Sequence, residues 1–168
     1  MTRTISSGFR DTLEATQSSE VAVWFATITH DDLQVPIYVN SDIVNYVYGG
    51  NTFLGCAFSL SFLTDDEQPP RAQVSIENVD QIIGETIQAL ADSPAIRIQL
   101  LVKSDFDDGD PRVEIGTPTV EVDASNLLLR NVKCDGLTLT GDLYGYDLMT
   151  EPYPSIRSTQ DRLPGLFR

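Results

Sequence analysis

The sequence has little of what most catalytic and redox sites need. It contains one histidine, His30, and two cysteines, Cys56 and Cys134, which lie far apart and form no CxxC motif. A Ser–His–acid or Cys–His set would have to use His30, and no G-x-S-x-G motif accompanies it. His30 precedes Asp31 and Asp32 in a predicted turn, where histidine is more often solvated than catalytic. We therefore expect that the chain is not an enzyme, and that both cysteines are buried thiols.

Basic residues and long apolar runs are also scarce. The 168 residues include 11 Lys and Arg against 25 Asp and Glu, which gives a formal net charge of −14. Such a surface repels phosphates, so we expect no nucleic-acid site made from a basic patch. No stretch reaches the roughly 18 apolar residues of a membrane span, and the N-terminus lacks the apolar core of a secretory signal. We expect a soluble protein, made in the cytoplasm of its host, with no membrane span.

Two acidic stretches are candidate sites. Counting from Asp105, residues 105–110 look like a calcium loop, but Gly109 falls fifth and Gly116 twelfth, where an EF-hand has glycine sixth and glutamate twelfth. An acidic turn is the better interpretation, with a weak calcium contact of another geometry left open. Asp65, Asp66 and Glu67 could supply the paired acids of a glycosidase, but nothing in the sequence brings two acids across a cleft. We expect an acidic loop there, and no metal or other cofactor.

Alternating apolar residues fill most of the chain. Gly49 and Gly50 mark a hairpin between segments 45–48 and 52–54. Pro36 suggests that segment 35–39 is an edge strand. Further strands are expected at 20–29, 58–62, 71–78, 95–102, 113–115, 119–122 and 127–132, with a last pair, 137–140 and 143–144, around Gly141-Asp142. About ten short strands indicate antiparallel β-sheets or a β-barrel-like body.

Two segments have helical spacing. Phe9 and Leu13 can share one side of a short helix, which Ser6 or Ser7 could cap. Residues 81–90 place apolar side chains at helical intervals, and Asp80 could cap them. Residues 1–146 are therefore expected to form one mainly β domain with two helical segments.

The last segment, residues 147–168, differs from the rest. It carries several prolines and large apolar side chains without a clear period, so it cannot form a helix or a central strand. It is also too apolar to extend freely into water. We expect an extended arm that packs on its own domain or on a neighbouring subunit. The side chains expected at that interface are Tyr153, Pro154, Leu163, Pro164, Leu166 and Phe167.

The order of these features resembles a known family. The opening helix runs into VAVWF at 21–25, and YGGNTF at 48–53 leads to FSL at 58–60. The most distinctive block is QPPRAQVSIENVD at 68–80; GDL at 141–143, EPYP at 151–154 and LPGLF at 163–167 follow. Over nearly its whole length the chain resembles the phage tail protein family DUF1833. More distantly, it resembles the N-terminal domain of lambda-type minor tail protein L.

The resemblance implies a structural component of a siphophage tail tip or baseplate. Such proteins form a ring that joins the distal tail tube to the central hub and surrounds the DNA channel. The implied partners are copies of the chain (three favoured, six as the alternative) and distal-tail and hub proteins, with DNA only as cargo. The implied location is the virion, after synthesis in the cytoplasm of a bacterial host.

Two points qualify the resemblance. L-type proteins continue into a cysteine-rich module that binds an iron–sulfur cluster, and two thiols cannot supply its usual four ligands. No cluster is therefore expected. The alternative function is a receptor- or glycan-binding module of the tail tip, for which Trp24, Tyr46 and Tyr48 are the candidate aromatic residues.

Overall fold

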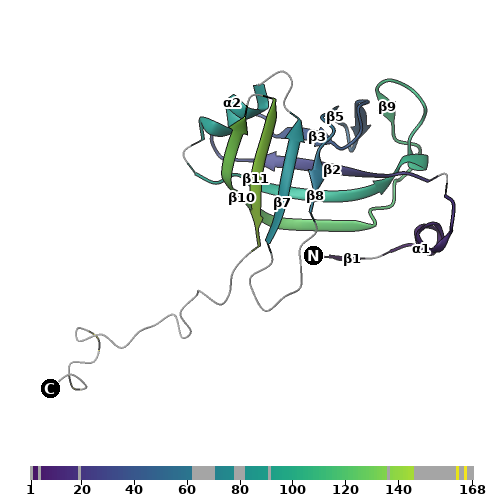
Figure 1. Ribbon diagram of the computed structural model, residues 1–168, viewed down its shortest axis with the longest axis horizontal. Coiled ribbons are helices and arrows are strands. Elements are labelled where there is room, and N and C mark those ends of the chain that lie inside the picture. Colours follow the sequence, from purple (N-terminus) through teal and green to yellow (C-terminus); the bar gives the residue numbers. More distant parts are fainter. Residues whose placement is uncertain are drawn as a thin grey trace.

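The computed structural model describes residues 2–3, 5–18, 20–61, 71–77, 82–90, 92–135, 137–145, 162 and 165. These residues form eleven strands and two α-helices (Figure 1). The strands are β1 (Thr2–Arg3), β2 (Ala22–Thr29), β3 (Ile37–Asn40), β4 (Tyr46–Tyr48), β5 (Asn51–Gly55), β6 (Ser59–Leu60), β7 (Arg71–Glu77), β8 (Ala95–Val102), β9 (Arg112–Val113), β10 (Val122–Asp135) and β11 (Thr138–Tyr144). The helices are α1 (Ser7–Glu14) and α2 (Ile82–Gln88), and a 3-10 turn spans Lys103–Asp105. The predicted mainly β class with two helical segments is confirmed.

The strands form one mixed sheet rather than purely antiparallel ones. Their order is β6-β7-β11-β10-β8-β2-β3-β5-β4-β9, and β1 pairs with β10. Most neighbours are antiparallel, but β3 pairs with β5, and β4 with β9, in parallel. The reason is the placing of the β4–β5 hairpin. Its second strand, β5, lies next to β3 and its first strand lies outside, so β5 runs in the same direction as β3.

The curved sheet closes into a barrel through the segment after β5. The backbone N–H of Cys56 donates to the carbonyl of Asn40, at the end of β3, over 3.1 Å. The carbonyl of Cys56 accepts from the N–H of Glu77, at the end of β7, over 3.2 Å. Ile83 and Ile87 of α2 join the barrel interior, and Figure 1 shows α2 at one end of β10 and β11. The barrel thereby encloses a single, mostly aliphatic core.

A second core lies outside the barrel wall. Along β2, Trp24 and Ala26 belong to the barrel side, while Val23 and Phe25 point the other way. Strands β4, β5 and β9, which we call the outer layer, cover this second face together with the loop before β9. The buried residues of the aromatic core between wall and layer are Val23, Phe25, Tyr46, Phe53, Leu101 and Phe106. The middle of β2 and the second half of β8 are therefore buried on both faces.

Local signals in the sequence were correct at one turn and at one helix cap. Gly49 and Gly50 connect β4 to β5 with φ angles of 57° and 76°, in the left-handed region that glycine adopts without strain. At α1, the N–H of Phe9 donates to the hydroxyl of Ser6 over 3.1 Å, so Ser6 rather than Ser7 is the cap. Asp80 lies outside the described residues.

Three strand predictions were wrong in detail. Pro36 does not mark an edge, because β3 begins at Ile37, after the proline, and lies between β2 and β5. Gly141 is not a turn residue: it pairs with Val74 in the middle of β11. A Cβ on Gly141 would lie 2.6 Å from Cδ1 of Leu129, so a larger residue there would require the Leu129 side chain to shift.

The third error concerns β10, which was predicted as two strands. It is one strand of 14 residues with two irregularities in its pairing. Asn126 and Asn131 have positive φ angles of 61° and 53°, and each lies where the register shifts. These bulges bend the strand, so that it pairs with β8 along its first half and with β11 along its second.

Candidate interaction surfaces

The outward face of the outer layer is apolar. Tyr46, Phe53 and Arg112 point inward from β4, β5 and β9, so their neighbours Val47, Leu54 and Val113 point outward. The large exposed residues of this region, which we call the outer patch, are Ile43 (82% exposed), Leu54, Val113 and Ile115 (61% exposed). Ile43 lies close to the end of β5, because its backbone carbonyl is 2.6 Å from a Cβ built on Gly55.

The acidic loop before β9 uses its carboxylates on its own backbone. Asp107 accepts from the N–H groups of Val113 and Gly109 over 2.8 and 3.1 Å, and its own N–H donates to the carbonyl of Val113. Asp105 accepts from the N–H of Thr119 over 3.1 Å. Asp107 thus occupies the edge of β9 where a further strand would pair. Among the described residues, no group of three His, Cys, Asp or Glu side chains could hold a metal ion.

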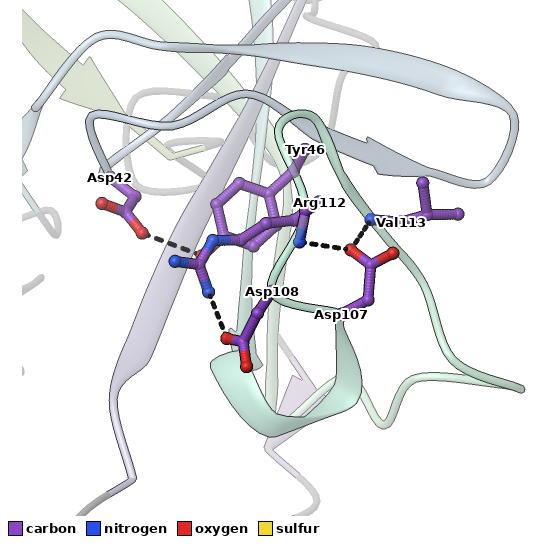
Figure 2. A network of polar contacts seen from close by, with 7 residues as sticks. Asp42, Tyr46, Asp107, Asp108, Arg112 and Val113 are labelled. Atoms are coloured by element: carbon purple, nitrogen blue, oxygen red, sulfur yellow. Dashed lines mark hydrogen bonds and ion pairs between the residues drawn. The ribbon is translucent and has the colours of Figure 1, made fainter.

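A polar network links this loop to the aromatic core (Figure 2). The hydroxyl of Tyr46 donates to Asp42 over 2.9 Å. The guanidinium of Arg112 lies over the Tyr46 ring, 5.7 Å from its centroid, and 3.5 Å from the carboxylate of Asp108. Burial and the adjacent Asp42 carboxylate raise the pKa of Tyr46 above its ordinary value. The network fixes the loop to β4, and both Asp42 and Arg112 were missed from the sequence.

A second polar anchor holds the N-terminal helix. Glu121 is 1% exposed, and its two carboxylate oxygens accept from the N–H and hydroxyl of Ser6 over 2.7 and 2.6 Å. Helix α1 itself buries no residue. A hollow of about 250 Å³ separates it from the body, with Phe9 and Thr12 on the helix side and Val102 on the body side. The contact is specific but not closely packed.

His30 lies in a turn, as predicted. Its Nδ1 accepts from the N–H of Asp32 over 3.1 Å. Beside it is an open hollow of about 510 Å³, whose lining includes Asp31, Asp92 and Ser93. The imidazole thus helps to shape the turn after β2.

The aromatic candidates for a receptor site are mostly in the interior. Tyr46 is fully buried, Tyr48 packs against the aromatic core, and Trp24 packs against the barrel core. Tyr46 of β4 pairs directly with Phe53 of β5 across the hairpin. These three side chains therefore serve packing and do not form a stacking platform.

Other predicted sites have different outcomes. Cys56 and Cys134 are thiols, as expected, but they are partly exposed rather than buried. Asp65, Asp66 and Glu67 lie outside the described residues, and so do the predicted interface residues Tyr153, Pro154, Leu163, Pro164, Leu166 and Phe167. Of the predicted arm, 147–168, only Arg162 and Gly165 are described. Neither described helix is long and apolar enough to cross a membrane.

A comparison with protein families matches most of the chain. The family described as domain of unknown function (DUF1833) matches residues 8–158. The matched region begins within α1 and extends past β11, so it includes the barrel and the outer layer. No curated protein matches the chain.

Proposed function

The chain belongs to the DUF1833 family, and we propose that it is a structural component of a bacteriophage tail tip or baseplate. In this proposal copies of the chain form a ring, three favoured over six, that joins the distal tail tube to the central hub. The ring surrounds the DNA channel and resides in the virion of a siphophage. The chain contributes contacts rather than catalysis.

The outer patch is the observation that carries this proposal. It consists of four exposed, large aliphatic residues on or next to the outer layer of a molecule whose formal net charge is −14. Exposed large apolar residues in one region of a charged protein favour an interaction surface. Fully burying one such side chain contributes about 1.5–3 kcal/mol. Because Asp107 occupies the edge of β9, a neighbour would pack on the face of the outer layer rather than add a strand to it.

The net charge supports the placing around a DNA channel. An acidic wall repels the phosphates of a passing duplex and gives it no binding site. Arg112, the first residue of β9 after the acidic loop, stacks on Tyr46 and contacts Asp108 instead of extending into solvent. The loop thus presents mainly carboxylates outward.

Cryo-electron microscopy of the tail tip of the encoding phage tests the proposal. We expect density for this chain as a closed ring below the tube, with the outer patch covered by a neighbouring subunit. Its absence from the virion would overturn the proposal. A position in a fibre tip that contacts the host surface would support the receptor-binding alternative instead.

A pair of variants isolates the outer patch. Leu54→Lys places a charge in the patch, and we expect a folded protein that is not incorporated into virions. Val35→Lys is the matched control, because Val35 is similarly exposed but lies in the connection between β2 and β3. The control should be incorporated like wild type, as judged by immunoblotting of purified particles.

A further inference from the structure

The N-terminal arm, by which we mean the described residues 2–3 and 5–18, touches the body at few points among those that the structure describes. Strand β1 contributes two residues, Thr2 and Arg3, which pair with Asp123 and Val122 of β10. Helix α1 buries no residue. Figure 1 shows α1 standing outside the sheets at one end of the molecule. Most of the arm is therefore held by contacts that can open without disturbing either core.

One of these contacts is built with high specificity. Ser6 donates its N–H and its hydroxyl to the two oxygens of Glu121, while the same hydroxyl accepts from the N–H of Phe9. The N-terminus of α1 thus faces a carboxylate, which its partial positive charge favours. Glu121 is almost fully buried, so a body without an arm would leave a specific acceptor unoccupied.

The surroundings of this contact are loosely packed. The hollow of about 250 Å³ lies between Phe9 and Thr12 on the arm and Val102 and Thr119 on the body. Apolar residues of the arm and its connection stay exposed: Leu13 is 64% exposed, and Ile5 and Val21 are partly exposed as well. A precise polar contact beside an unfilled hollow fits a reversible connection better than a permanent core.

The connection to β2 is long enough to let the arm move. The exposed residues between α1 and β2 include Thr16, Gln17 and Ser18. The seven residues from the end of α1 to the start of β2 span roughly 23 Å when extended. A second copy of the chain presents the same β10 edge and the same Glu121, so its body can receive the arm with identical contacts.

We propose that the N-terminal arm is exchanged between copies, with Ser6 of one chain binding Glu121 of the next. Each body then receives one arm and donates its own, which links the copies around a closed ring. The exchange rests on the proposed self-assembly, and it adds a connection independent of the outer patch. It also brings the exposed Ile5, Leu13 and Val21 to a boundary between subunits, where they can be covered.

A cross-linking experiment on purified chains tests the exchange. One tagged chain carries Thr12→Cys and a second, with a different tag, carries Thr119→Cys; both positions line the hollow, one on the arm and one on the body. The two are co-expressed, concentrated in high salt to screen the acidic charge, and treated with a short bismaleimide. Samples of each variant alone and of wild type show how much of the product comes from reaction of the bismaleimide with Cys56 and Cys134.

Exchange predicts a covalent pair of the two tagged chains, well above the single-variant controls. Ser6→Ala should reduce this product about tenfold, whereas Ser7→Ala, its exposed neighbour, should not. A chain carrying both cysteines that yields only an internal cross-link, with no mixed pair, would overturn the exchange. A failed cross-link would not contradict a ring of this chain in the virion. Conversely, absence of the chain from the virion would not contradict a mixed cross-linked pair, so the two proposals can fail separately.

Discussion

The barrel core and the aromatic core solve the problem of burial in different ways. The barrel interior is filled almost entirely by aliphatic side chains from long strands and α2. The aromatic core has six fully buried residues, and four of them are the rings of Phe25, Tyr46, Phe53 and Phe106. The ring of Phe25 lies within 5.0–5.6 Å of the other three, centroid to centroid.

The difference follows from the lengths of the strands. The outer layer has strands of three, five and two residues, which are too short to be stable alone. A buried aromatic side chain covers about 150–250 Å², so a few rings give these strands the burial that many aliphatic residues give the barrel. The outer layer therefore depends on the wall formed by β2 and β8, whereas the barrel core is complete without the layer.

The largest expected effect is in the barrel. Leu139→Ala removes a fully buried side chain from β11, and we expect it to lower the free energy of unfolding by about 2–5 kcal/mol. Leu137→Ala is the control, because Leu137 lies just before β11 and is 61% exposed; its cost should stay within about 0.5 kcal/mol. Urea denaturation measures both. Equal losses would contradict the assignment of Leu139 to the barrel core.

A smaller loss is expected where the barrel meets the outer layer. A Cβ on Gly55 would lie 2.6 Å from the backbone carbonyl of Ile43, and backbone cannot rotate away as a side chain can. We expect Gly55→Ala to cost about 1–3 kcal/mol through overpacking. Gly8→Ala, where the added methyl meets nothing within 4 Å, should be neutral or slightly stabilising in the same denaturation series. If Gly55→Ala left the free energy of unfolding unchanged, the contact between Gly55 and the Ile43 backbone would not be closely packed.

The same two regions differ in how well the sequence predicts them. The alternation in residues 95–102 predicts the full extent of β8, because both neighbours impose a period of two on it. In the outer layer the hairpin was predicted from Gly49 and Gly50, and a strand was expected at 113–115, which overlaps β9; how these elements pair was not predicted. The parallel pairing of β9 with β4 depends on contacts between segments more than 60 residues apart, and no local pattern encodes such a pairing.

The polar anchors were missed for a related reason. Glu121 lies between Val120 and Val122, so alternation places it on a solvated face, yet it is buried because the N-terminal arm covers it. Arg112 directly follows an acidic loop in the sequence, and only the fold brings it over the ring of Tyr46. Burial of a charged group follows from tertiary contacts that composition and periodicity do not contain.

The hydroxyl of Tyr46 should have a moderate effect. Tyr46→Phe removes the hydrogen bond to Asp42 and should cost about 0.5–1.5 kcal/mol at neutral pH. The pKa of Tyr46 is raised in the folded state. Its contribution is therefore complete below the ordinary tyrosine value of about 10 and declines as the pH rises through the folded value. Between pH 8 and pH 11 the free energy of unfolding should fall less for Tyr46→Phe than for wild type. Equal decreases would contradict the raised pKa of Tyr46 as the cause.

The smallest effect is expected on the exposed side of the barrel wall, beyond the aromatic core. Arg97 donates two hydrogen bonds to Asp123, one of them over 3.0 Å, and this contact lowers the pKa of Asp123. The contribution is present above the ordinary aspartate pKa of about 3.9 and is lost as the pH falls through the lower folded value. Because Arg97 is half exposed, Asp123→Asn should cost only about 0.2–1 kcal/mol at pH 7, and the difference from wild type should vanish near pH 2. Asp135 is exposed, so Asp135→Asn serves as the control and should leave the free energy of unfolding unchanged at both pH 7 and pH 2. A loss at Asp123→Asn that persists at pH 2 would mean that the side chain acts through packing, as residues of the two cores do, rather than through its charge.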